Sequence, residues 1–464
     1  MSTESGIWMS GDGRSPRAGR SPGKLTAEIH EEALALLCDL LRIDTTNPPG
    51  NERPAAELCA EALRAEGLEP KLLEGAKDRT NLICRYRGTG ELPPLMLTAH
   101  LDVVPPGDGW THPPFEARIV DGWLYGRGAI DMKNHVAMCV TVLRALAREK
   151  ARLRRDVLLV LVADEEAGCT WGSEWLVRNH ADKIRAEYAL GEIGGFPLHM
   201  EGRRIYPIQV AQKGVLWLRA RTRGEGGHGS MPRERTAVGD LVRAVSRLVR
   251  RPMPIEVTPP AREFLDALAA QLGPKGAALR ALSRPWLARA VLRALPDRSL
   301  ARTLRALLSN TVTVNVLRAG EKTNVIPRAA EAEIDCRTLP GKAGEKAMQQ
   351  IRDRVGPEVE FEVLQQAPAV EFTSKTPLFE SLAAAIRRAD PEAVVIPYMI
   401  PGFTDALAFA HNGTTCYGFT PVYLPEGVVF ADLYHNVDER IWVEGFHFGL
   451  ELLYDAVRTF CAEG

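Results

Sequence analysis

The sequence predicts an α/β protein into which a smaller α+β domain is inserted. Between residues 81 and 193, short apolar runs alternate with amphipathic segments, an alternation typical of a largely parallel sheet with covering helices. From about Gln212 the order changes to strand–helix–strand–strand–helix–strand, which is the split ferredoxin-like order. A length of 464 residues also exceeds what one hydrophobic core usually supports, so we expect two domains.

The first part of the chain supplies the elements of the α/β domain. Its helical segments show apolar residues at helical spacing, and Gly67 stands where a C-capping glycine belongs. The predicted helices are 31–42, 52–67, 136–150 and 173–184. The predicted strands are 81–87, 94–100, 156–163 and 188–193.

The inserted domain also shows strand and helix patterns, in a different order along the chain. Its predicted elements are the strand 214–224, the helix 235–251, the strands 311–320 and 328–339, the helix 345–356 and the strand 359–366. A segment rich in Leu, Ala and Arg, roughly 260–308, is predicted to add extra helices. We therefore assign 25–211 and 372–464 to the first domain, which ends in the helix 443–461, and 212–371 to the second. Residues 1–24 are rich in Gly, Ser, Pro and Arg and are predicted to be a disordered tail.

The composition excludes several classes of partner. The 58 Lys and Arg against 59 Asp and Glu give a net charge of −1, which predicts neither nucleic-acid nor membrane binding. No apolar stretch is long enough for a signal peptide or a membrane span, so we expect a cytoplasmic protein. The 8 cysteines are scattered without a C-x-x-C pair, which is typical of buried thiols in a reducing compartment.

Metal-ligand residue types stand at the ends of the predicted strands. His100 ends one strand and Asp102 follows at i+2, so His100 could bind a metal while Asp102 holds its other ring nitrogen. Such a pair is more often structural when it stands alone. Asp131 precedes a helix, where it could bridge two metals through its two oxygens or simply cap the helix.

Further acids follow the next two strands. Asp164, Glu165 and Glu166 repel one another unless a cation lies near them, although a solvated acidic loop is the commoner structure. Adjacent acids can divide between metal binding and general-base catalysis. Glu192 ends another strand, and His435 precedes the last helix, where a lone histidine is more often structural.

Together these residues predict a two-metal centre. Ligands of open α/β sheets bind beyond the carboxyl ends of the strands, where several of these side chains lie. Histidines and carboxylates without thiolates suit zinc and tolerate cobalt or manganese. Asp131, Glu166 and Glu192, with one hydroxide, would neutralise two divalent ions, as a buried cluster requires.

The order of the motifs resembles one family. The segments HLDVVP, GRGAIDMK, ADEEAG, GEIGG, GGHGSMP, TNVIP, PGFTDA and HNVDERI occur in the order found in peptidase family M20, the aminoacylase, carboxypeptidase and desuccinylase family of dinuclear zinc hydrolases. The resemblance covers about residue 25 to the end and implies a zinc-peptidase catalytic domain of the phosphorylase/hydrolase-like fold with an inserted lid and dimerisation domain. The long 260–308 segment resembles the carboxypeptidase-S-like branch, and Asn134 stands where many relatives have glycine.

The resemblance also implies a role for each site residue. One metal would be held by His100, Asp131 and Glu192, and the other by Asp131, Glu166 and His435, with Glu165 as the general base and Asp102 orienting the first histidine. His228 would reach a neighbouring active site across a homodimer. Asn324, Arg337 and Thr404 match substrate-binding positions. Arg337 could instead be a strand arginine that pairs with Asp335.

The expected activity is hydrolysis of an amide bond next to a free carboxylate, in a peptide or an N-acyl amino acid. Two alternatives keep the site and change the substrate, namely an aminopeptidase and an N-carbamoyl amino acid hydrolase. The intact run Asp164–Glu165–Glu166 disfavours the carbamoyl substrate. A non-catalytic binding protein on the same scaffold is a third alternative, which the presence of every expected ligand and of the base disfavours.

Overall fold

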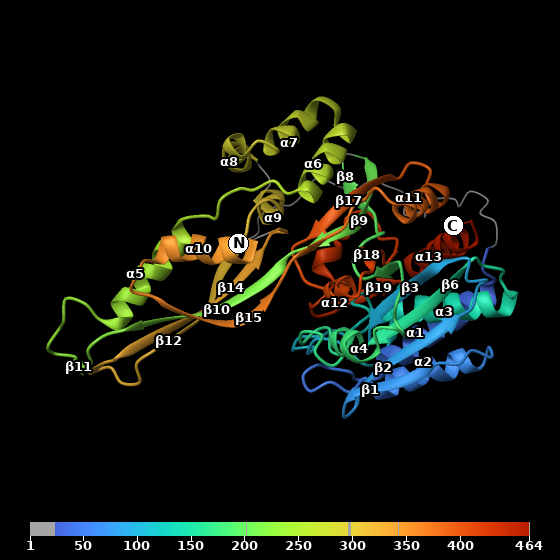
Figure 1. Cartoon of the computed structure of the whole chain (residues 1–464), viewed down its shortest axis with the longest axis horizontal. Coiled ribbons are helices and arrows are strands. Elements are labelled where there is room, and N and C mark those ends of the chain that lie inside the picture. Colours follow the sequence, from blue (N-terminus) through green and yellow to red (C-terminus); the bar gives the residue numbers. More distant parts are fainter. Residues whose placement is uncertain (1–23, 201, 296–297, 342, 464) are drawn as a thin grey trace. The chain divides into compact units, whose positions relative to one another are not determined.

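The computed structural model describes residues 24–463 except 201, 296–297 and 342 (Figure 1). Residues 1–23 of the predicted tail lie outside the described residues. The chain divides into two compact units. Unit 1 comprises Met1–Gln209, Phe372–Ile396 and Thr404–Gly464, and unit 2 comprises Val210–Glu371 and Pro397–Phe403.

Unit 1 is built from helices and strands that alternate along the chain. Its helices are α1 (Ala27–Arg42), α2 (Arg53–Arg64), α3 (Lys133–Glu149), α4 (Ser173–His180), α11 (Pro377–Ala389), α12 (Ala406–His411) and α13 (Val443–Glu463). Its strands are β1 (Lys71–Ala76), β2 (Arg79–Tyr86), β3 (Leu92–His100), β4 (Arg118–Val120), β5 (Trp123–Tyr125), β6 (Arg155–Val162), β7 (Tyr188–Gly191), β8 (Leu198–Met200), β18 (Thr415–Gly418) and β19 (Arg440–Trp442). Strands β9 (Arg203–Gln212) and β17 (Val394–Ile400) continue from unit 1 into unit 2.

The main sheet runs in the order β1-β2-β6-β3-β7-β18-β9-β16, where β16 is Val370–Glu371. Its centre is parallel, because β3 pairs in parallel with β6 and β7, and β18 pairs in parallel with β7. The two edges are antiparallel. The parallel centre places the carboxyl ends of four strands at the same edge of the sheet.

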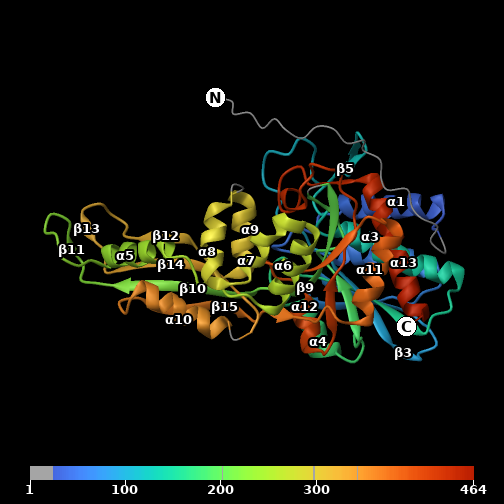
Figure 2. The ribbon, with the colours of Figure 1, turned by 90° about the horizontal axis from the view of Figure 1, so that it is seen from above.

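Helices cover both faces of this sheet. Leu158, Val160 and Val162 of β6 share one apolar cluster with residues of α4 and α12. Leu159 and Leu161 point to the opposite face, because side chains alternate along a strand, and they are equally buried. Helices α3 and α13 contact β6, and α3 lies beside α1 and α13 (Figure 2). Unit 1 is therefore a three-layer α/β structure.

Local signals determine where these helices begin and end. Helix α1 begins at Ala27, four residues before the predicted start. The Thr26 side chain caps it by accepting a hydrogen bond from the Ile29 backbone. Thr376 caps α11 in the same way through Phe379. Helix α3 ends at Glu149, and its C-cap Lys150 adopts the left-handed conformation.

Unit 2 contains a four-stranded antiparallel sheet in the order β12-β14-β10-β15. Its elements are β10 (Gly214–Arg223), β11 (Gly227–His228), α5 (Ala237–Arg250), β12 (Thr311–Ala319), β13 (Val325–Ile326), β14 (Ala329–Thr338), α10 (Ala343–Val355) and β15 (Glu360–Ala367). Both α5 and α10 pack on one face, where Leu218, Leu241 and Ile351 belong to one apolar core. The opposite face carries ion pairs such as Arg221–Glu331.

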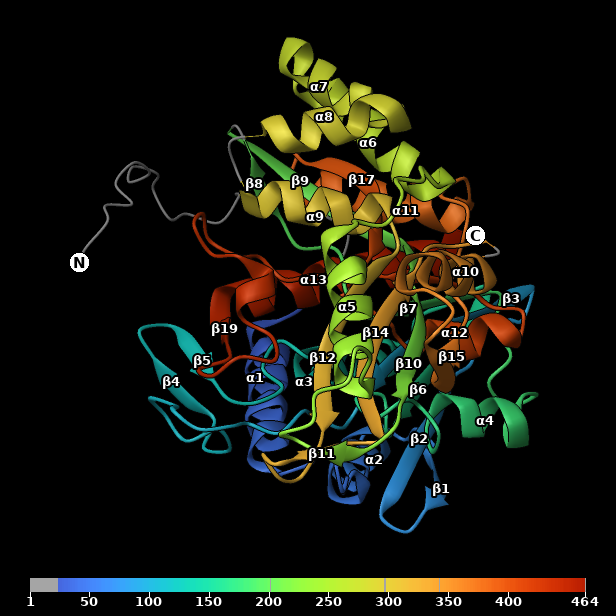
Figure 3. The same cartoon turned by 90° about the vertical axis from the view of Figure 1, so that its left-hand side faces the viewer.

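A helical segment separates α5 from β12 in the sequence. It contains α6 (Pro259–Gln271), a 3₁₀ turn (Gly273–Gly276), α7 (Ala277–Leu282), α8 (Pro285–Ala294) and α9 (Arg298–Leu308). Each of these helices packs against its neighbour in the sequence, and α6, α7 and α8 form a group of olive helices (Figure 3). None of the helices among the described residues is long and apolar enough to cross a bilayer.

Candidate metal centre

Three neighbouring strands of the main sheet lead into side chains that are typical metal ligands. Strand β3 ends at His100, β6 leads into the loop that carries Glu166, and β7 is followed directly by Glu192. Because β3 pairs in parallel with both β6 and β7, the three carboxyl ends lie at one edge. Ligands of open α/β sheets bind in this position.

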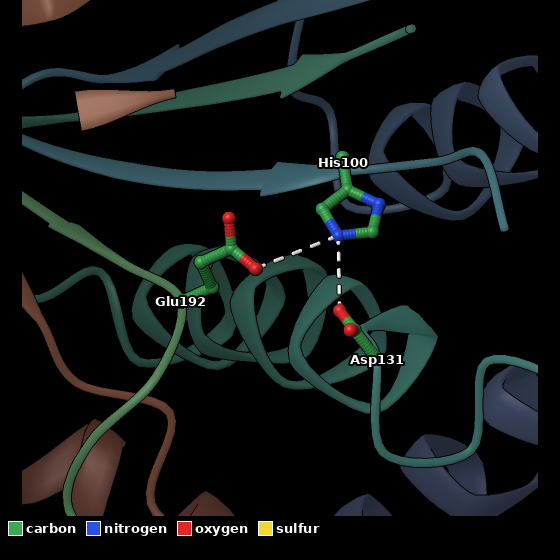
Figure 4. Close-up of side chains that lie close together, drawn as sticks. All are labelled: His100, Asp131 and Glu192. Carbon is green, nitrogen blue, oxygen red and sulfur yellow. Dashed lines mark hydrogen bonds and ion pairs between the residues drawn. The ribbon is translucent and has the colours of Figure 1, made fainter. Parts of the chain in front are cut away.

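The first group of ligands is centred on His100, whose side chain is fully buried. Its Nε2 atom lies 3.1 Å from Asp131 Oδ1 and 3.7 Å from Glu192 Oε2 (Figure 4). Its Nδ1 atom lies 2.9 Å from the backbone carbonyl oxygen of Asp102. A carbonyl oxygen only accepts hydrogen bonds, so in the neutral ring this contact places the proton on Nδ1 and leaves the Nε2 lone pair toward the two acids.

The second group shares a carboxylate with the first. His435 Nε2 lies 3.2 Å from Asp131 Oδ2 and 3.2 Å from Glu166 Oε1. The two oxygens of Asp131 therefore face two different histidines, and within each group the ligand atoms lie within 4.8 Å of one another. The alternative role of Asp131 as a helix cap is not seen, because the N-cap of α3 is Met132.

The buried carboxylate of Glu439 holds the loop that carries Asp131. It accepts hydrogen bonds from the backbone nitrogens of Gly128, Ile130 and Asp131 at 2.7–3.1 Å. The Arg127 guanidinium donates to the same carboxylate at 2.6 Å. These bonds fix the backbone on which the shared ligand stands. Glu439 lies inside the HNVDERI motif, but no local pattern in the sequence indicates its bonds to residues 128–131.

Asp102 connects the first histidine to the acidic loop. Its carboxylate accepts the backbone N–H groups of Glu165 and Glu166, both at 3.1 Å. The sequence predicted that this carboxylate holds the His100 ring, but it lies 3.6 Å from Nδ1, and the Asp102 carbonyl is the closer partner. The side chain of Asp102 is thus occupied with positioning the loop that carries the second-group ligand.

A buried polar network extends from Asp102 away from the ligands. The Asn47 amide donates to Asp102 at 2.8 Å and to Asp164 at 3.0 Å. Arg79 donates to Asp164 at 2.9 Å and to both oxygens of Glu52 at 2.7 and 2.8 Å. Sequence reasoning missed Asn47, Glu52 and Arg79, because the first two belong to a loop rich in proline and glycine whose composition indicates only a turn.

The electrostatics of the centre favour a bound cation. Burial raises the pKa of the Glu192 carboxyl to about 7. Burial and then the Glu192 charge raise the pKa of Glu165 well above its ordinary value. Hydrogen bonds to Asp131 and then to Glu166 raise the pKa of His435 to about 10. Acids held this close to one another are stabilised in their ionised form by divalent cations. Two imidazoles with carboxylates and no thiolate are donors that fit zinc.

A small enclosed cavity lies beside Glu192. Thr404 and Asp405 line it, and its volume of about 20 Å³ is enough for one water molecule. Three oxygens of its lining residues, Glu192 Oε1, Gln209 Oε1 and Thr98 Oγ1, are buried and have no hydrogen-bond partner among the described residues. Thr404, predicted as a substrate-binding residue, is therefore close to a predicted ligand but buried.

The remaining predicted site residues belong to unit 2. His228 pairs with Val325 between β11 and β13, and the residue after His228 donates a hydrogen bond to the Asn324 carbonyl at 2.8 Å. His228 and Asn324 are thus neighbours, and both are exposed. Strand β14 begins at Ala329, three residues after β13, and Arg337 lies near its far end. The eight residues from Ala329 to Arg337 span about 26 Å of strand. The Arg337 guanidinium is bound to Asp335 at 2.9 and 3.3 Å, as the simpler alternative supposed.

The comparisons with known proteins identify the family of the chain. The model of "Peptidase family M20/M25/M40" matches residues 96–459. The chain is 30% identical to human "N-fatty-acyl-amino acid synthase/hydrolase PM20D1" over 79% of this chain and 74% of the relative. It is 28% identical to "Probable carboxypeptidase S-like 2" of Dictyostelium discoideum over 82% and 74% of the two chains. An M20 family metallo-carboxypeptidase from Sulfolobus solfataricus has the same fold, with a TM-score of 0.72, 19% identity and 92% and 99% of the two chains covered. The family predicted from the motifs is confirmed, and the chain belongs to peptidase family M20.

Proposed function

We propose that this protein hydrolyses an amide bond next to a free carboxylate, in a peptide or an N-acyl amino acid, with two divalent metal ions. The observation that carries the proposal is the division of Asp131 between two histidine-containing groups, one oxygen to each. A carboxylate whose two oxygens face two histidines in this way can bridge two metal ions. The family membership and the activities that the relatives' names state support the same reaction class.

The side chains fit a pair of zinc ions, with cobalt or manganese as substitutes. His100, Asp131 and Glu192 would hold one ion, and Asp131, Glu166 and His435 the other. Bound there, the ions would lower the pKa of an attacking water and polarise the amide carbonyl.

Glu165 is the proposed general base. It lies beside the ligand Glu166 and is held in place by Asp102, but none of the described residues donates a hydrogen bond to its carboxylate. Burial and then the Glu192 charge raise its pKa well above the ordinary value, which is the direction in which general-base carboxylates are tuned. It would accept the proton of the attacking water and deliver it to the leaving amine.

The substrate would be held by residues of unit 2. Arg337 is proposed to bind the free carboxylate of the substrate. The hydrogen bonds from its guanidinium to Asp335 would then have to break, or the guanidinium would have to bind both carboxylates. His228 would stabilise the developing oxyanion, and Asn324, its neighbour, would polarise the carbonyl. Thr404 of unit 1, which lines the cavity beside Glu192, is the remaining proposed substrate-binding residue.

We propose that two chains complete each site. Within unit 2, most of the length of β14 separates the His228–Asn324 pair from Arg337. One chain is therefore expected to bind the substrate carboxylate through its own Arg337, while the partner chain supplies His228 and Asn324 to the same site. Strand β12 is an edge of the unit 2 sheet, and Leu317 on it is 63% exposed. Val242 and Val249 of α5 are 60% and 65% exposed and lie seven residues apart on one helix face. A homodimer that pairs these surfaces would bury them.

A reducing compartment fits the cysteines. All eight are buried and unpaired. Burial raises the pKa of Cys59 to about 12 and of Cys461 to about 12, which keeps both as thiols. The cytoplasm is therefore the proposed location.

The reaction is tested by metal content together with a substrate panel. We expect about two zinc ions per chain and cleavage of N-acyl amino acids, with short and long acyl chains, and of dipeptides with a free carboxyl terminus. Amino-acid anilides with a free amino terminus should not be cleaved, since they lack the carboxylate. Anilide cleavage would identify an aminopeptidase instead, and cleavage of N-carbamoyl amino acids alone would identify the carbamoyl alternative. Absence of turnover with zinc, cobalt and manganese would identify a binding protein.

The shared site is tested by complementation. Glu165→Gln and His228→Ala should each lose about 10²- to 10³-fold of kcat. After the two variants are mixed and their subunits exchanged, half of the dimers would contain one intact site, so about a quarter of wild-type activity should return. The measurement is specific activity against exchange time. If activity does not return although subunit exchange is observed, His228 acts within its own chain or not at all.

The positioning of the acidic loop is tested at Asn47. Asn47→Leu keeps the approximate size of the side chain but removes the donor that joins Asp102 to Asp164. We expect kcat to fall by about 10- to 100-fold and KM to change little, since residues that hold metal ligands in place through hydrogen bonds have effects of this size. Asn51→Leu, in the same loop but exposed, is the matched control. A lower Tm with unchanged kcat would show that Asn47 serves stability alone.

A further inference from the structure

The segment α7–α9 of unit 2 has a charge very different from that of the whole chain. Between residues 273 and 308 there are eight Lys and Arg and one acid, Asp297, which gives +7. Because the whole chain carries −1, the remaining residues together carry −8. The net charge of the whole chain, from which no membrane partner was predicted, is therefore the sum of one strongly basic segment and an acidic remainder. The proposed reaction assigns no role to this basic segment.

The basic side chains of this segment lie on its surface. Arg280, Arg284, Arg289 and Arg293 are all exposed, and none forms an ion pair with an acid among the described residues. Helices α7, α8 and α9 contain no Asp or Glu. Elsewhere in unit 2 the exposed arginines are commonly paired, as in Arg223–Glu360 and Arg318–Glu333. The basic charge of α7 and α8 is thus not neutralised by neighbouring acids.

Helix α8 presents an aromatic ring among these charges. Its buried residues are Ala288 and Leu292, which are four positions apart and face the rest of the segment. Trp286 lies on the opposite face and is 73% exposed, the largest value for any exposed large apolar side chain of the described residues. At helical spacing, Arg289 and Arg293 fall on the same face as Trp286, at i+3 and i+7.

We propose that this face of α8, together with Arg280 and Arg284, binds the surface of a membrane that contains anionic lipids. Trp286 and the arginines beside it present an apolar ring and positive charge to the same surface, and burial of apolar area together with attraction to anionic lipids is what binds peripheral segments to membranes. Tryptophan prefers the headgroup level because its ring is apolar and its N–H is polar. Arginines near an anionic leaflet are attracted to it without specific pockets.

A nucleic acid is the other polyanion that such a charge attracts, but the face does not suit it. Sequence-tolerant binding of single strands needs several aromatic rings on which successive bases stack. Helices α7, α8 and α9 contain one aromatic residue, Trp286. The helices are also short, at 6, 10 and 11 residues. The membrane surface is therefore the partner that the observations favour.

The experiment is co-sedimentation of the full-length protein with vesicles. We expect binding to vesicles of phosphatidylcholine with about 30% phosphatidylglycerol at low salt, and loss of binding at high salt because surface charges are screened. Pure phosphatidylcholine vesicles should bind at least tenfold less. Arg289→Glu combined with Arg293→Glu should reduce binding at least tenfold, and Trp286→Ala severalfold.

The control has the same change in net charge at another place. Arg64 and Arg87 are exposed residues of unit 1, and their double replacement by Glu should leave vesicle binding unchanged. Circular dichroism, Tm and hydrolysis of a small soluble substrate should be unchanged in all these variants, which separates this proposal from the proposed reaction. Equal loss in the control, equal binding to phosphatidylcholine, or tighter binding to single-stranded DNA or RNA than to anionic vesicles would overturn the proposal.

Discussion

The site depends on one carboxylate that faces two histidines. Asp131 directs Oδ1 to His100 and Oδ2 to His435, so that the two ligand groups cannot be moved independently. Burial alone would raise the pKa of Asp131, but its hydrogen bonds with the two histidines lower it strongly, so the group stays ionised. A buried, ionised carboxylate is costly unless it is paired or coordinates metal. The surrounding structure holds the Asp131 carboxylate and the two histidines in place.

Two separate sets of buried bonds provide that support. Glu439 binds the backbone of the loop that carries Asp131, and Asp102 binds the backbone of the loop that carries Glu165 and Glu166. In both cases a carboxylate that is not itself a ligand accepts backbone N–H groups. This arrangement fixes the loops through their main chains and leaves the ligand side chains free for the metals. It explains why irregular segments can present a precise site.

The parts that could be predicted from the sequence are those with local signals. Apolar runs that end in His100 or Glu192 are visible without a structure, and strands in parallel bring their ends together. His435 comes after the whole inserted region in the sequence, and its place beside Asp131 and Glu166 was assigned only by the family resemblance. Strand β9 was not predicted, because Pro207 within its run is atypical of a central strand. The bonds of Arg79 and of Glu439 join residues far apart in sequence, and no local pattern indicates such partners.

The central claim is that the two groups form one dinuclear centre through Asp131. The most direct measurement is titration of the metal-free protein with zinc by calorimetry, for the wild type and for Asp131→Ala and Glu192→Gln. We expect two ions per wild-type chain, severe weakening of both sites in Asp131→Ala, and weakening of one site in Glu192→Gln. Two ions bound by Asp131→Ala with wild-type affinity, or a single ion bound by the wild type, would contradict the central claim.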